Sequence, residues 1–124
     1  MENVSIREYI ESDLPYLREA LVKLNDHIAA ADPLRRIFTG EGFKELYTAN
    51  MLELCERQKK KKFICESEGA AAGFTACVIV EYSSFDKLSY FGKIEGRIIE
   101  FFVEESHRGT GAAQALLKEA EDFF

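Results

Sequence analysis

The sequence lacks the patterns that mark zinc proteins, disulfide-rich secreted proteins and membrane proteins. Its three cysteines, Cys55, Cys65 and Cys77, stand singly without a C-x-x-C pair, and the chain has only two histidines. This usage predicts no metal site and no disulfide framework, and is typical of reduced core thiols in a cytoplasmic protein. No apolar run approaches membrane-spanning length, and nothing at the N-terminus indicates a signal peptide.

An excess of positive charge is also missing, since 16 Lys and Arg face 22 Asp and Glu for a net charge of −6. This balance argues against non-specific binding to nucleic acid. Four consecutive lysines, 59–62, run against the trend. We interpret 58–62 as the solvated C-terminus of a helix, where positive charge complements the helix dipole, in preference to a nucleic-acid or membrane patch.

What is present is the content of one globular domain, residues 1–124, with 47% hydrophobic residues. The alternation in 4–10 predicts a strand with one buried face. Ser12 as a cap and Pro15 in the first turn then predict a helix. Its apolar stripe is Leu14, Leu17, Leu21, Leu24 and Ile28. A loop spans 29–42, and a second helix follows with Phe43, Leu46, Tyr47, Met51, Leu54 and Cys55 on one side.

The second half of the chain reads mainly as strands. Residues 63–67 and 71–82 are two strands joined by a hairpin turn at Glu68-Gly69. The strand 71–82 is apolar on both faces, which predicts a central place in the sheet. A long polar and aromatic connection, 83–96, leads to a third strand, and its Tyr90 and Phe91 either line a pocket or cover the sheet edge.

The stretch 97–124 organises the chain. Residues 97–103 suit a buried strand, and Ala113, Leu116, Leu117, Ala120 and Phe124 fall at helical spacing. A glycine turn between strand and helix presents free backbone N–H groups at the positive end of the helix dipole. Arg108 adds a fixed charge, so the turn suits a phosphate. The alternative is an ordinary turn in which Gly109 and Gly111 supply positive φ.

Arg108-x-x-Gly111-x-Ala113, followed by Leu116-Leu117, resembles motif A of the GNAT superfamily of acetyl-CoA-dependent N-acetyltransferases. The resemblance implies an α/β fold of the α+β type: a mostly antiparallel sheet flanked by helices, in the order strand, two helices, three strands, helix. It also implies that acetyl-CoA is the cosubstrate, without a metal. The cofactor-binding residues expected from it are Phe102, Val103, Arg108, Gly109, Thr110, Gly111, Ala112 and Ala113.

For catalysis the resemblance assigns oxyanion stabilisation to the backbone N–H of Val103. Glu100 is the only carboxylate within 98–103, and it is a candidate general base, a residue that attracts a cationic amine, or a solvent-facing side chain. Glu104 and Glu105 are expected to be surface charge. The loop between the two helices lies over the acceptor pocket in the family. Its candidates for substrate contact, each otherwise a solvated loop residue, are Asp26, His27, Asp32, Arg35, Arg36 and Phe38.

Family members continue past the motif A helix with a strand, a helix and further strands, and no tyrosine here matches their general acid. We therefore expect either a truncated product or a second copy or partner chain that completes the sheet. Two functions stay open. The first is an N-acetyltransferase acting on a primary amine of a small molecule or lysine side chain, for which the acidic loops favour a cationic acceptor. The second is a non-catalytic module that binds CoA weakly or serves in interaction.

Overall fold

The computed structural model describes residues 4–92 and 94–124, which form one four-stranded antiparallel sheet in the order β1-β2-β3-β4. The strands are β1 (Val4–Glu8), β2 (Lys59–Ser67), β3 (Ala70–Glu81) and β4 (Ile94–Val103). The helices are α1 (Leu14–Ala31), α2 (Phe43–Glu56) and α3 (Ala112–Phe123), with single turns of 3-10 helix at η1 (Glu11–Asp13), η2 (Asp86–Leu88) and η3 (Glu105–His107). The predicted fold class and element order are confirmed.

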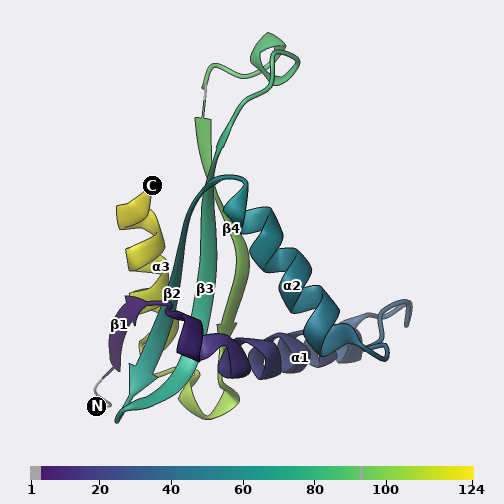
Figure 1. The fold of residues 1–124 in the computed structure, drawn as a ribbon, viewed down its shortest axis with the longest axis vertical. Coiled ribbons are helices and arrows are strands. Elements are labelled where there is room, and N and C mark those ends of the chain that lie inside the picture. Colours follow the sequence, from purple (N-terminus) through teal and green to yellow (C-terminus); the bar gives the residue numbers. More distant parts are fainter. Residues whose placement is uncertain (1–3, 93) are drawn as a thin grey trace.

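The helices cover the two faces of the sheet in separate layers (Figure 1). Ile64 and Phe74 belong to the core cluster that α1 and α2 cover, whereas Phe63 and Cys65 belong to the cluster under α3. Since successive side chains of a strand point to opposite faces, the two clusters lie on opposite sides of the sheet. Both faces of β2 and β3 are therefore buried, and β3 lies centrally, as predicted.

The hairpin between β2 and β3 forms at the predicted position. Glu68 and Gly69 have φ values of 53° and 80°, the left-handed pair that a two-residue hairpin of type I′ requires. Every pairing in the sheet is antiparallel. Within the described ranges, no helix is long and apolar enough to cross a membrane.

The lysine run was misassigned. α2 ends at Glu56, and Lys59, Lys60, Lys61 and Lys62 form the first part of β2, paired with Ala76 to Ile79 of β3. Lys61 forms an ion pair with Glu8 of β1, and the Lys62 ammonium lies 4.6 Å from the centroid of the Tyr9 ring. Pairing with a central strand overrides the weak strand propensity of lysine.

Three helix details also differ from the predictions. α1 begins at Leu14, one residue after the start that a Ser12 cap predicts, and its N-cap residue is Asp13; the Asp13 carboxylate accepts the Ile10 N–H at 2.8 Å at the start of η1. α3 buries Ala112, Leu116 and Ala120, while Leu117 and Phe124 are half-exposed. α2 buries Thr48, Met51 and Cys55 and leaves Leu46 and Leu54 exposed. Met51 and Cys55 of α2 and Leu116 and Ala120 of α3 are buried as predicted, whereas the burial of Thr48 and Ala112 was not predicted.

A bulge in β4 shapes the α2 side of the sheet. Ala76 pairs with Glu100 and Cys77 with Ile98, so Ile99 is the extra residue. The buried Thr75 hydroxyl donates to the Glu100 carbonyl oxygen at 2.9 Å beside the bulge. Both Ile99 and Glu100 consequently line the space under α2.

β4 is an edge strand: only β3 pairs with it among the described residues. Beyond the body of the sheet, the connection between β3 and β4 extends away from the helices (Figure 1). Tyr90 and Phe91 lie on this extension and are exposed, together with Phe85 and Leu88. They line none of the pockets described below, so of the two roles predicted for them the pocket-lining one finds no support.

Candidate functional site

The turn between β4 and α3 has the geometry of an anion site. Gly109 and Gly111 have φ values of 81° and 95°, so the positive-φ explanation for these glycines is correct in itself. Apart from the adjacent residues of the turn, no atom of the described residues lies within 4 Å of the position that a Cβ would occupy on either glycine. The space over the turn is open, so a phosphate group can approach the backbone here.

Backbone donors are available in this turn. No hydrogen bond joins the N–H groups of residues 109–113 to another residue in the described ranges. These five groups include the first amides of α3, where the helix dipole favours an anion. Arg108 is exposed beside them. The free amides of Gly109, Thr110, Gly111, Ala112 and Ala113 are compatible with a bound anion, and their role in holding a pyrophosphate stays a prediction.

The end of β4 directs its backbone toward the free edge of the sheet. The Glu104 N–H donates to the Ala72 carbonyl oxygen at 2.8 Å, facing β3. Because the antiparallel ladder alternates, the N–H and C=O of Val103 face away from β3. The Arg108 Nε donates to that Val103 carbonyl at 3.2 Å. The Val103 N–H is thus the group left free for a ligand at this edge, while the side chain of Phe102 is buried under α1.

Glu104 is not simple surface charge, contrary to expectation. Its carboxylate accepts hydrogen bonds from the Lys23 ammonium at 3.0 Å and the Tyr16 hydroxyl at 3.3 Å, which tie the end of β4 to α1. Burial, followed by the charge of Glu104, raises the pKa of Tyr16, so its hydroxyl remains protonated. A pocket of about 400 Å³ lies beside this contact, lined by Lys23, His27, Phe102, Glu104, Glu105 and Arg108.

Glu100 faces a second pocket, between α2 and the sheet. The Tyr47 hydroxyl donates to Glu100 Oε1 at 2.5 Å. Burial raises the pKa of Glu100, and the hydrogen bond from Tyr47 partly offsets this shift. The pocket has a volume of about 250 Å³ and is lined by Tyr47, Asn50, Met51, Leu54, Gln58, Val78, Ile99 and Glu100. A half-buried carboxylate with a raised pKa can accept a proton from an amine, so Glu100 suits a base.

Most loop candidates have local partners. Asp32 accepts the backbone N–H groups of Leu34 and Arg36, and these bonds lower its pKa and fold the start of the loop. Asp26 accepts the Thr39 hydroxyl. Arg35, Arg36 and Phe38 are exposed. Only His27 lines one of the two pockets next to the β4 residues.

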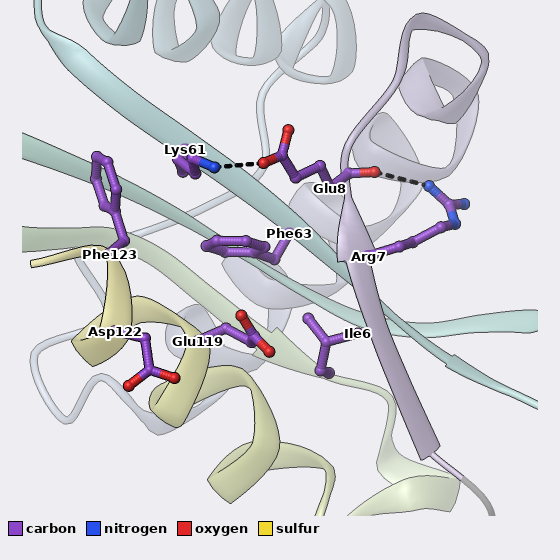
Figure 2. Close-up of a pocket in the computed structure, with 8 residues that line it drawn as sticks. All are labelled: Ile6, Arg7, Glu8, Lys61, Phe63, Glu119, Asp122 and Phe123. Atoms are coloured by element: carbon purple, nitrogen blue, oxygen red, sulfur yellow. Dashed lines mark hydrogen bonds and ion pairs between the residues drawn. The ribbon is translucent and has the colours of Figure 1, made fainter.

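A further groove of about 430 Å³ lies between β1, β2 and α3 (Figure 2), lined by Ile6, Arg7, Glu8, Lys61, Phe63, Glu119, Asp122 and Phe123. None of the predicted site residues contributes to it. Across the described part of the chain, no group of three or more His, Cys, Asp or Glu residues could hold a metal ion.

Comparison with known proteins identifies this architecture. The family model described as "Acetyltransferase (GNAT) family" matches residues 28–124. The chain belongs to the GNAT acetyltransferase family. No curated protein gave a significant match to this chain.

Solved structures share this GNAT fold at low sequence identity. A GCN5-related N-acetyltransferase from Ralstonia eutropha is 20% identical, with a TM-score of 0.69 over 98% of this chain and 76% of its own. A predicted acetyltransferase from Clostridium acetobutylicum, solved with acetyl-CoA, is 15% identical, with a TM-score of 0.67 over 98% and 73%. An aminoglycoside 6′-N-acetyltransferase from Acinetobacter haemolyticus is 18% identical, with a TM-score of 0.67 over 96% and 70%.

The sequence analysis of this GNAT domain missed Tyr47, Gln58 and Lys23 as site residues. Tyr47 was placed on the core-facing side of α2, and its hydroxyl instead reaches a residue 53 positions away on β4. Gln58 was grouped with the lysines that follow it. No local pattern in the sequence signals that Tyr47 and Gln58 line a pocket, because their positions depend on how α2 packs over the bulge in β4.

Proposed function

We propose that this GNAT domain transfers an acetyl group from acetyl-CoA to a primary amine. The observation that carries the proposal is the open turn at 109–113, whose backbone amides have no acceptor within the described residues, directly after the outward-facing backbone of Val103. A pyrophosphate on the amides and an extended arm along Val103 fit this arrangement.

The proposed reaction uses the Glu100 carboxylate in the pocket under α2 and the Val103 N–H at the end of β4. Glu100 receives a proton from the amine, directly or through water, and the freed nitrogen attacks the thioester carbonyl. The Val103 N–H stabilises the oxyanion, which collapses as the carbon–sulfur bond breaks. CoA leaves as the thiolate, the nitrogen releases its second proton to solvent, and the proton held by Glu100 also passes to solvent. We assign no general acid to a residue of this chain.

The acceptor carries a positive charge before it reacts, because Glu100 is the carboxylate of the α2 pocket. The aminoglycoside and N-acetyltransferase names among the similar structures support amines as a class. A small-molecule amine and a lysine side chain both satisfy this requirement. A second copy or a partner chain that pairs with the free edge of β4 is also part of the proposal.

Calorimetric titration of acetyl-CoA into the purified chain tests the cofactor site. Arg108→Glu should weaken binding, because it places a negative charge beside the pyrophosphate. Lys118→Glu is the matched control: it changes the net charge equally, but Lys118 lies on the exposed side of α3 in an ion pair with Asp122. Equal affinities in the two variants, or no binding by the wild type, would overturn the site and favour a non-catalytic module.

Turnover with a primary amine tests the base. Glu100→Gln should reduce kcat about 100-fold or more, the usual contribution of a general base, and leave acetyl-CoA affinity nearly unchanged. Glu95→Gln serves as the control, since Glu95 is on the same strand and pairs with Arg97 away from the pocket. A Glu100→Gln variant as active as the wild type would remove Glu100 from the mechanism.

A further inference from the structure

The pocket under α2 has one charged end and one neutral end. Tyr47, Asn50, Met51 and Leu54 form one stripe of α2, which Gln58 continues just after the helix. Glu100 and Tyr47 form one end. Leu54 lies seven residues from Tyr47, which at 1.5 Å per residue corresponds to about 10 Å of helix axis, and Gln58 follows two residues past the end of α2. The pocket is therefore elongated along α2.

The middle of the pocket is apolar. Met51 and Leu54 from α2 face Val78 of β3 and Ile99 of β4. Because of the bulge in β4, Ile99 and Glu100 both line this pocket. In a regular strand two successive side chains would point to opposite faces. These four side chains can cover a methylene chain but offer it no hydrogen bond. A volume of about 250 Å³ is below the range of about 300–1,000 Å³ for drug-sized ligands, so the occupant is small.

Gln58 provides an unused acceptor. Its side-chain oxygen Oε1 is buried and accepts no hydrogen bond from another residue in the described ranges. A buried carbonyl oxygen without a donor is unfavourable, and a ligand N–H or O–H would satisfy it. Glu100 is the only carboxylate that lines this pocket. No carboxylate therefore lines the Gln58 end of this pocket, and the neighbouring pocket that Gln58 also lines carries two cations, Arg57 and Lys59, beside Glu81, which does not favour a second ammonium group.

We infer that the pocket holds the acceptor chain: a primary amine at Glu100, an apolar chain of several methylenes, and a neutral hydrogen-bond donor at Gln58. This inference rests on the proposed acetyl transfer and narrows its acceptor class. It selects monocationic amines with a distal amide or hydroxyl, such as a lysine side chain or a monoacylated diamine. It disfavours diamines and other polyamines, whose distal cation would be desolvated without a partner.

Three amines with the same chain length test the inference: N-acetylcadaverine, n-pentylamine and cadaverine. The wild type should acetylate N-acetylcadaverine with a kcat/KM about threefold to tenfold above that of n-pentylamine, the value of one hydrogen bond. Cadaverine should be the poorest substrate. Equal kcat/KM values for the three amines, or a preference for cadaverine, would overturn the inference while leaving acetyl transfer intact.

Two substitutions at Gln58 sharpen the test. Gln58→Met keeps the size but removes the acceptor, so the advantage of N-acetylcadaverine over n-pentylamine should disappear. Gln58→Glu should reverse the order and make cadaverine the best substrate. Gln114→Met is the matched control, because Gln114 is an exposed glutamine of α3 that does not line this pocket, and it should keep the wild-type order. An unchanged order in Gln58→Met would contradict the role of Gln58.

Ligand-observed NMR with N-acetylcadaverine distinguishes a failure of the pocket inference from a failure of the transferase proposal. Binding that is lost in Gln58→Met, without turnover by the wild type, would support the pocket and overturn the transferase proposal. Turnover without dependence on Gln58 would do the reverse. If the wild type neither bound nor acetylated N-acetylcadaverine, both the pocket inference and the transferase proposal would be overturned.

Discussion

At the scale of single residues, Tyr47 and Glu100 act as one unit. Burial raises the pKa of Glu100, and the hydroxyl of Tyr47 lowers it by donating to the charged form. The same contact, after burial, raises the pKa of Tyr47 to about 12, so the phenol keeps its proton at neutral pH. In the proposed mechanism, Tyr47 is therefore a positioning residue that lowers the pKa of Glu100 and so increases the fraction of Glu100 that is ionised.

Tyr47→Phe removes this donor and should move the pKa of Glu100 further upward. A base must be deprotonated to act, so the acidic limb of the pH profile of kcat should shift to higher pH. Activity at high pH, where Glu100 is ionised in both proteins, should recover toward the wild-type value. The profile of the wild type itself should have its acidic limb above the ordinary glutamate value of 4.5.

A purely structural role for Tyr47 would lower activity equally at every pH. Phe43→Leu is the control, because Phe43 stacks on the Tyr47 ring at 4.6 Å between centroids but makes no contact with Glu100 through a hydrogen bond. An acidic limb that stays in place in Tyr47→Phe, or moves as much in Phe43→Leu, would remove Tyr47 from the control of Glu100.

At the scale of elements, the sequence predicted which strands and helices exist better than which sides they bury. Hairpin chemistry at Glu68-Gly69 and the strand-turn-helix at 97–124 are local, and both formed where expected. The first half of β2 was missed because its lysines have no strand signal of their own. Their placement depends on Glu8, Glu56 and Tyr9, which only the folded chain brings near them.

The pairing of β3 with β4 depends on a glycine whose role local sequence does not reveal. A Cβ on Gly73 would lie 2.6 Å from the Phe102 carbonyl oxygen and 3.2 Å from the Val103 Cα. Both atoms are backbone and cannot turn aside. Gly73→Ala should therefore lower the free energy of unfolding by about 1–3 kcal/mol, as overpacking in a core does.

Chemical denaturation measures this loss, and acetyl-CoA titration should show weaker binding because Val103 is displaced. Gly40→Ala is the matched control: its nearest neighbour is the exposed ring of Phe38, which can move. If Gly73→Ala were as stable as Gly40→Ala, the close approach of the two strands would not constrain the site.

At the scale of the whole molecule, the sequence indicated the open turn between β4 and α3 but not the pocket under α2. The turn at 108–113 is one continuous segment whose glycines and arginine are visible in the sequence. The α2 pocket combines residues from α2, β3 and β4 and needs the bulge at Ile99. The Gln58 side-chain oxygen is recognised as a buried acceptor without a donor only once the packing of the chain is known.

The unpaired edge of β4 leads to a prediction about assembly. β4 runs for ten residues, has no pairing partner on one side within the described residues, and exposes Ile94 and Ile98. Proteins ordinarily cover or charge such an edge, because its free N–H and C=O groups pair with other strands. We expect the chain to associate at micromolar concentration, through this edge, with a second copy.

Size-exclusion chromatography with light scattering tests the assembly. Ile98→Lys places a charge on the edge and should shift the chain to a monomer, whereas Leu46→Lys, at an exposed position of α2, should not. A second copy along β4 would also lie beside the outward-facing backbone of Val103. Acetyl-CoA affinity should then change with protein concentration in the wild type but not in Ile98→Lys. A monomeric wild type at micromolar concentration, or dimers of equal stability in both variants, would contradict association through β4.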